Sequence, residues 1–185
     1  MKVNTEYGTL TAEEYLEREK GSVLKHEFFY GKLLDMPGNT LLHDDIKNFL
    51  AAFFNSQLRK VGFRAFTSDV KVEAVESEAY FYPDVVLADM KEQDKQSYLV
   101  EKPVLIAEIL SNSTRSYDAV DKYIQYRKIP TLQYYLLVEP DTMLITCLTK
   151  QDDGEWISNI YTKPESTIPL EKWGISIRVG EVYGV

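Results

Sequence analysis

Two carboxylates occupy positions where a charged side chain is unexpected. Asp84 follows a proline inside an aromatic run and precedes an apolar run, so its carboxylate lies where a strand is about to enter the core. Glu108 lies inside the apolar segment 104–110, where the period of a strand puts it on the same face as Ile106 and Leu110. A lone buried carboxylate is costly unless it is paired, hydrogen-bonded or bound to a metal.

Two such carboxylates on successive buried strands can face a common point. Mg²⁺ or Mn²⁺ bound there could activate water and hold a phosphodiester oxygen. We therefore expect Asp84 and Glu108 to be metal ligands of a catalytic site. The alternative for Asp84 is that it caps a turn or accepts backbone hydrogen bonds, whereas a glutamate in such an apolar run has few structural explanations.

The strands and helices that would position these acids follow from the apolar periodicity. Consecutive apolar residues predict buried strands at 80–88 and 104–110, separated by the polar, exposed connection 89–102. Helical spacing predicts amphipathic helices at 43–60 and 117–128, with Ser116 as the cap of the second one.

The rest of the chain adds one short helix and several strands. Thr11 and Glu14 predict a capped helix that ends at Gly21. Strands are predicted at 26–36, at 63–74 with Lys71 and Glu73 on a wet face, at 133–138, at 143–148, and in the tail at 156–161 and 175–179. This order predicts an α/β fold with a central mixed sheet flanked by helices and extra strands from both ends of the chain.

Length and charge limit the possible functions. A chain of 185 residues can bury one core without splitting, so we expect residues 1–185 to form a single domain. The net charge of −8 argues against a protein that coats nucleic acid non-specifically, because that affinity comes from basic side chains. The charge does not exclude a nuclease, because cations bound at its site supply a local positive field for the phosphate.

The single cysteine and the hydropathy indicate the compartment. Cys147 is the only cysteine and therefore forms no disulfide within the chain, which favours a reducing cytoplasm. Residues 1–21 lack the apolar stretch of a secretory signal, and no window approaches the roughly 20 apolar residues of a membrane span. We expect a cytoplasmic protein without membrane insertion.

The order of the motifs resembles a known nuclease group. Pro83 and Asp84, then Glu108 in an apolar strand, then a helix with Asp118, Lys122 and Tyr126, are similar to the PD-(D/E)XK superfamily of metal-dependent nucleases. More narrowly, the chain resembles the Uma-type putative restriction endonucleases over roughly residues 11–150. The stretches that carry the resemblance are 25–27, Gly31, Met36, His43, 82–86, 108–114, 118–123 and 134–138.

The chain departs from the superfamily pattern at one position. That pattern has a lysine two residues after the second carboxylate, where this sequence has Leu110. The resemblance implies that Lys122 supplies the ammonium group from the following helix and orients or deprotonates water. The alternative is an ordinary solvent-facing salt bridge with Asp118, four residues earlier on the helix.

Other polar residues could extend the site. Glu27 is a candidate further metal ligand, and His43 could contribute its imidazole. The alternative for His43 is that it is only a residue of the first helical turn, beside Asp44 and Asp45. His26 could simply pair with a neighbouring carboxylate. Ser111, Ser113 and Thr114 are interpreted as turn-forming and capping residues rather than as phosphate ligands.

These observations lead to competing expectations for function. The leading one is an Mg²⁺- or Mn²⁺-dependent endodeoxyribonuclease that acts on DNA as a homodimer, because symmetric cutting of a duplex requires two sites related by a two-fold axis. The alternatives are a catalytically inactive nuclease fold that serves as a binding or assembly module, and an enzyme that acts on RNA or another phosphoester. No helix shows a basic reading face, so no recognition sequence is predicted.

Overall fold

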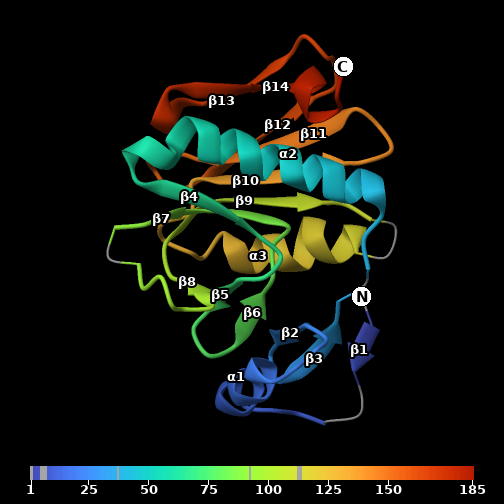
Figure 1. The fold of residues 1–185 in the computed structure, drawn as a ribbon, viewed down its shortest axis with the longest axis vertical. Helices are drawn as coiled ribbons and strands as arrows, with labels where there is room; N and C mark the ends of the chain where they lie inside the picture. The colour runs from blue at the N-terminus through green and yellow to red at the C-terminus, as the bar shows by residue number, and fades with distance from the viewer. Residues whose placement is uncertain (1, 5–7, 37, 92, 112–113) are drawn as a thin grey trace.

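The computed structural model describes residues 2–4, 8–36, 38–91, 93–111 and 114–185. Its strands form two six-stranded sheets and one two-stranded sheet. One six-stranded sheet lies in the middle of the molecule; the C-terminal strands lie at one end of the long axis and the N-terminal strands with helix α1 at the other (Figure 1). This is the predicted α/β class. No helix in these ranges is long and apolar enough to cross a bilayer.

The central sheet contains the predicted buried strand at 104–110, whereas the predicted strand at 80–88 is wrong in extent, because it is divided into Ala79–Phe81 of the second sheet and Val85–Asp89 of this one. Its strand order is β12-β11-β10-β9-β7-β4; β9 and β10 run parallel, and the other neighbouring pairs run antiparallel. The strands are β4 (Phe63–Thr67), β7 (Val85–Asp89), β9 (Pro103–Ile109), β10 (Tyr134–Glu139), β11 (Leu144–Lys150) and β12 (Trp156–Tyr161). Because β7 and β9 are neighbours, Asp84 just before β7 and Glu108 near the end of β9 are brought close together.

Both faces of the central sheet are buried at β7, β9 and β10, as the continuous apolar runs predict, while the outer strand β12 is largely exposed. Leu105 belongs to the face that packs against helix α2 (Leu41–Leu58), which runs across the sheet in Figure 1. Ile106 belongs to the other face, which packs against the helical segment that ends in α3 (Tyr123–Tyr126). The alternation of β9 directs Glu108 to the Ile106 face, toward α3.

Strands from the first 100 residues form the second sheet, of order β1-β3-β2-β6-β5-β8. Its strands are β1 (Lys2–Asn4), β2 (His26–Phe29), β3 (Lys32–Asp35), β5 (Lys71–Val75), β6 (Ala79–Phe81) and β8 (Leu99–Val100). Helix α1 (Ala12–Lys20) covers it by stacking Tyr15 on Phe28, with ring centroids 5.0 Å apart. The predicted capping box of Thr11 and Glu14 is present, and Gly21 caps the end of the helix.

Some predicted strands are wrong in their extent. Residues 26–36 form a hairpin rather than one strand, because Tyr30 and Gly31 both have positive φ, 46° and 83°. Only the glycine signals such a turn in a sequence. Residues 63–74 form two strands in different sheets, and Lys71 is buried rather than on a wet face, with its ammonium 3.3 Å from the Tyr82 hydroxyl.

The C-terminal tail adds a small layer against α2. It consists of β13 (Thr167–Leu170), the 3₁₀ turn Glu171–Trp173, β14 (Ile175–Arg178) and the short helix α4 (Val179–Val182). The predicted strand at 175–179 therefore ends one residue early, because Val179 begins α4. Ile177 and Val179 are both fully buried in the core that includes α2.

The outer edge of β4 is closed by a side chain. Asn55 on α2 donates to the Ala65 carbonyl at 3.0 Å and accepts from the Ala65 amide at 3.1 Å, as another strand would.

We expect Asn55→Ala to lower the free energy of unfolding by about 1–3 kcal/mol in urea denaturation, because both backbone groups lose their partner. The neighbouring exposed Ser56→Ala is the control and should cost about 0.5 kcal/mol or less. Equal losses for the two variants would contradict this role of Asn55.

Candidate active site

The two predicted carboxylates converge where β7 begins and β9 ends. The Asp84 amide donates a hydrogen bond to Glu108 Oε2 at 3.1 Å, and the Ile109 amide donates to Asp84 Oδ2 at 2.8 Å. These reciprocal bonds link acids that are 24 residues apart in sequence and fix the direction of both side chains. Asp84 accepts a backbone hydrogen bond, which was the alternative to a role as a metal ligand. It does so next to Glu108, so the two carboxylates still lie together.

Lys122 lies among three carboxylates. Its ammonium is 2.8 Å from Glu27 Oε1, 3.1 Å from Glu108 Oε1 and 3.2 Å from Asp118 Oδ1. The side chains of this cluster are almost fully buried, so the solvent-facing salt bridge considered for Asp118 and Lys122 is wrong. The ammonium faces the carboxylates, as the migrated-lysine hypothesis requires.

The buried charges shift one another's protonation equilibria. Burial raises the pKa of Glu108 well above its ordinary range; Lys122 opposes this shift, and the charges of Asp118 and Asp84 add to it. Burial alone would lower the pKa of Lys122, but the surrounding carboxylates, Glu108 first, outweigh burial and raise it. The cluster therefore keeps its lysine charged and disfavours negative charge on Glu108.

A local widening of the helix positions the lysine. Residues Tyr117–Lys122 form a π-helical turn that continues directly into α3. Such turns are rare and recur at functional sites. The predicted Ser116 cap is wrong, because Ser116 is already helical and makes no capping hydrogen bond. Ser111 accepts from the Thr114 amide at 3.2 Å and so has the predicted turn-forming role, while Ser113 lies outside the described residues.

Tyrosine hydroxyls and a backbone amide also bond to the residues of the site, and these contacts were not predicted, although Tyr126, Tyr82 and Tyr135 are among the residues that carry the nuclease resemblance. Tyr126 on α3 donates to Glu108 Oε1 at 3.2 Å. The Tyr82 amide donates to Glu27 Oε1 at 3.0 Å. Tyr135 on β10 donates to the Asp118 carbonyl at 2.8 Å and thereby holds the π-helical turn against the sheet.

Glu27 and His43 also reach the site. Glu27 on β2 is fully buried, and its Oε2 has no hydrogen-bond partner among the described residues. His43, in the first turn of α2, has its Nε2 3.1 Å from Asp84 Oδ2. His26, in contrast, lies 3.1 Å from Glu19, which agrees with the prediction that it pairs with a neighbouring carboxylate.

These side chains surround a small cavity of about 70 Å³. Its acidic and basic lining consists of Glu27, His43, Asp84, Glu108, Asp118 and Lys122. The Asp84 side chain is 15% exposed and that of Glu108 3%, so Asp84 is the acid nearer to solvent. The volume suits a small cation with a few waters, since one water takes about 30 Å³ in the liquid.

The donor chemistry suits a hard divalent cation. Mg²⁺ prefers oxygen ligands and is commonly held by one or two carboxylates together with water and substrate phosphate. Within the described ranges, no three histidine, cysteine or acidic side chains form a ready metal cage. The Lys122 ammonium lies within 3.2 Å of Glu27, Glu108 and Asp118, so these three carboxylates are paired with a cation of the protein itself. A site with Asp84 and Glu108 as ligands fits the residues present.

Comparison with known proteins bears on the fold and on the family. A family described as "Uma2: Putative restriction endonuclease" matches residues 12–179. The chain belongs to this Uma2 family. The Synechocystis protein slr1290, whose name describes no function, is 33% identical to this chain over 174 residues, covering 94% of this chain and 91% of the relative. Synechocystis sll1609 is 35% identical over 150 residues, 80% of this chain and 85% of the relative.

A solved structure shares the fold of this Uma2 protein. It is a putative nuclease belonging to DUF820 from Anabaena variabilis, and the two align with a TM-score of 0.78 over 95% of this chain and 98% of that one. At 16% sequence identity, this likeness shows a common fold. The predicted Uma-type resemblance and the restriction-endonuclease-like core are therefore confirmed, while the roles of Asp84, Glu108, Lys122 and Glu27 stay predictions.

Proposed function

We propose that this Uma2 protein is a divalent-metal-dependent endodeoxyribonuclease, a single restriction-endonuclease-like domain that hydrolyses DNA phosphodiester bonds. The observation that carries the proposal is the convergence of Asp84 and Glu108 on one cavity beside the Lys122 ammonium. The family description and the fold of a putative nuclease support a nuclease in the broader sense.

Each residue has a distinct part in this proposal. When bound, Mg²⁺ or Mn²⁺ supplies a Lewis acid that activates water and neutralises charge on the phosphate. Asp84 and Glu108 would hold the cation, and the amides of Asp84 and Ile109 keep their carboxylates aligned. His43 orients the Asp84 carboxylate through its Nε2. Glu27 is proposed as a further ligand through its buried, unpartnered oxygen.

Lys122 acts in this proposal as a fixed positive charge. An ammonium has three donors, and three carboxylates lie within 3.2 Å of it. Its positive charge offsets the negative charge of the carboxylates near the phosphate. It also stabilises the negative charge that develops during phosphodiester cleavage. We place it beside the cation rather than in the role of a proton acceptor.

Metal dependence on defined substrates tests the proposal. Supercoiled plasmid, single-stranded DNA and RNA are incubated with the protein in Mg²⁺, in Mn²⁺ and after EDTA treatment. We expect nicked and linear DNA in either metal, no product in EDTA and recovery when Mg²⁺ is restored. Cleavage that survives EDTA would rule out the metal-dependent reaction. Cleavage of RNA but not of DNA would show that RNA, and not DNA, is the substrate.

One sequence feature favours a second candidate, a non-catalytic binding or assembly module. Leu110 occupies the position at which the nuclease pattern has its lysine. A lysine on the following helix, Lys122, supports a catalytic role less strongly than a lysine at the usual position would. A module of this kind would bind nucleic acid without cutting it in any metal. The Asp84→Ala protein would then match the wild type in every cleavage assay.

The proposal includes a cytoplasmic homodimer. A lone cysteine suits a reducing compartment, and cutting both strands of a duplex at one place needs two copies of the site. Light scattering of the purified protein should give twice the mass of the 21.4 kDa chain. A monomer mass at the concentrations used for cleavage would contradict the dimer.

A further inference from the structure

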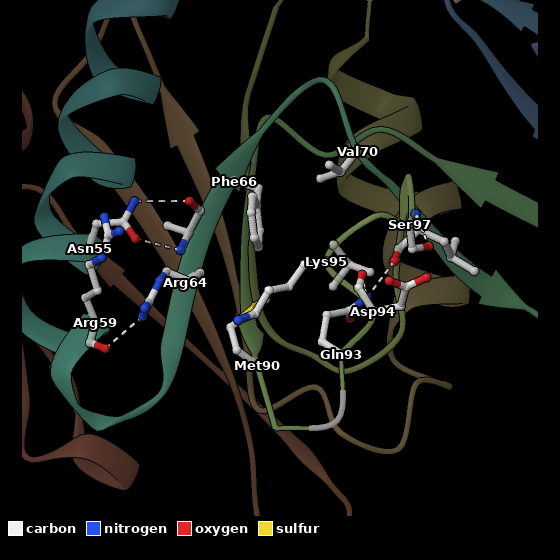
Figure 2. A pocket seen from close by; sticks show the side chains of 13 residues that line it. Asn55, Arg59, Arg64, Phe66, Val70, Met90, Gln93, Asp94, Lys95 and Ser97 are labelled. Atoms are coloured by element: carbon white, nitrogen blue, oxygen red, sulfur yellow. Dashed lines mark hydrogen bonds between the residues drawn. The ribbon is translucent and has the colours of Figure 1, made fainter. Parts of the chain in front are cut away.

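A second and larger pocket lies at the β4 edge of the central sheet, apart from the candidate active site (Figure 2). Its volume is about 460 Å³. The walls come from β4, from the end of α2 and from the connection between β7 and β9. This edge pocket is defined by Asn55, Arg59, Arg64, Phe66, Met90 and Lys95.

The edge pocket is basic although the chain is acidic. Arg59, Arg64 and Lys95 line it, and Asp94 is the one acidic side chain among the described residues of the lining. The chain as a whole has a net charge of −8. A polyanion can bind an acidic protein only where the local potential is positive. The charge of this pocket therefore suits a phosphate-bearing ligand.

The neutral polar groups of the pocket are already engaged. Asn55 bonds to the Ala65 backbone, and Gln93 donates to the Leu99 carbonyl at 3.1 Å and accepts from the Glu101 amide at 3.0 Å. Neither amide is available to read the edge of a base. The cationic groups are what the pocket offers to a ligand, so binding should not depend on base sequence.

The cations are combined with an apolar wall. Arg64 uses one guanidinium nitrogen for the carbonyls of Arg59 and Phe63, and a guanidinium carries further donors. Phe66 and Met90 face the pocket, and Lys95 extends across it toward Met90 (Figure 2). Aromatic and apolar surface next to cations suits the sugar and base faces beside a phosphate.

The edge pocket and the candidate active site share one segment of chain. Phe66 and Val70 line the pocket, while Ser68 between them lines the active-site cavity. Along α2, twelve residues separate His43 at the cavity from Asn55 at the pocket, which corresponds to about 18 Å. About five base pairs of B-form DNA cover that distance.

We propose that the edge pocket binds the phosphate backbone of the nucleic acid whose other part lies at Asp84 and Glu108, about five base pairs from the bond that is cut. This inference rests on the proposed nuclease function and adds a positioning site to it. The pocket needs no metal, because its own side chains supply the positive charge.

Charge reversal in the pocket tests this inference. Arg59 and Lys95 are both exposed, so Arg59→Glu/Lys95→Glu should fold normally. The matched control is Lys163→Glu/Arg178→Glu, which makes the same change of charge on two exposed residues in the C-terminal part of the chain. Binding is measured in EDTA by fluorescence anisotropy of a labelled duplex of about 20 base pairs, which can reach both sites.

We expect the pocket variant to bind the duplex at least about tenfold more weakly, equally for different sequences, with a salt slope smaller by about two. The control should stay within about twofold of the wild type. Equal weakening by both double variants, or no binding by the wild type in EDTA, would overturn the edge-pocket proposal. Cleavage by the wild type in Mg²⁺ would leave the nuclease proposal intact in either case.

Discussion

The Asp84→Asn protein is expected to cleave plasmid DNA at least about a thousand-fold more slowly than the wild type, a loss of about 4 kcal/mol of transition-state stabilisation. Asparagine keeps the size of the side chain and an oxygen that can accept from the Ile109 amide, so the fold should persist. What it removes is the negative charge that would bind the cation. The rates are compared by gel electrophoresis at saturating Mg²⁺.

The control for this substitution lies at the other end of the same strand. Asp89 ends β7 and accepts from the Lys91 amide, away from the cavity of Asp84 and Glu108. Asp89→Asn changes the net charge equally and should cut at the wild-type rate. If Asp84→Asn retains wild-type cleavage while its melting curve is unchanged, Asp84 is not a ligand of the catalytic cation.

Lys122→Met is expected to destabilise the protein by about 3–5 kcal/mol, because it leaves buried carboxylates without their counter-ion. Glu27, Glu108 and Asp118 all lie within 3.2 Å of the ammonium, and their side chains are at most 6% exposed. Urea denaturation gives the free energy of unfolding. Lys20→Met is the control: its ion pair with Glu17 is largely exposed and screened by solvent, so its loss should leave the free energy of unfolding nearly unchanged.

The loss in Lys122→Met should depend on pH in a defined direction. Burial already raises the pKa of Glu108 and of Glu27, and removal of the ammonium takes away the charge that opposes this rise. Acids with a raised pKa in the folded state stabilise it at low pH and lose that contribution as the pH rises. The destabilisation should therefore be smaller near pH 5 than near pH 8. A loss that is no larger than that of Lys20→Met at both pH values would show that the cluster does not depend on its lysine.

The two acids of the site could be found from local sequence because each interrupts an apolar run. Glu108 is a charged residue within a buried strand and Asp84 immediately precedes one, and adjacent buried strands are the simplest arrangement for such runs. Lys122 could be proposed only through a family resemblance. Its distance from Glu108 depends on how α3 packs against β9, and no local pattern contains that information.

Other features depend on contacts between distant residues and were missed or misjudged. Tyr30 takes a positive φ in the β2–β3 turn although its residue type favours a strand. Lys71 has the alternation of an exposed residue, yet it is buried near the Tyr82 hydroxyl. The edge pocket combines α2, β4 and the 89–102 connection, which the sequence suggested to be only an exposed loop.

Binding of Mn²⁺ to the purified protein tests the central claim most directly, because it needs no knowledge of the substrate. Calorimetric titration is compared for the wild type and for Glu108→Gln, which keeps an acceptor for the Asp84 amide. We expect the wild type to bind Mn²⁺ and the variant to lose at least about tenfold in affinity. Equal affinity in a folded variant would contradict a cation shared by Asp84 and Glu108.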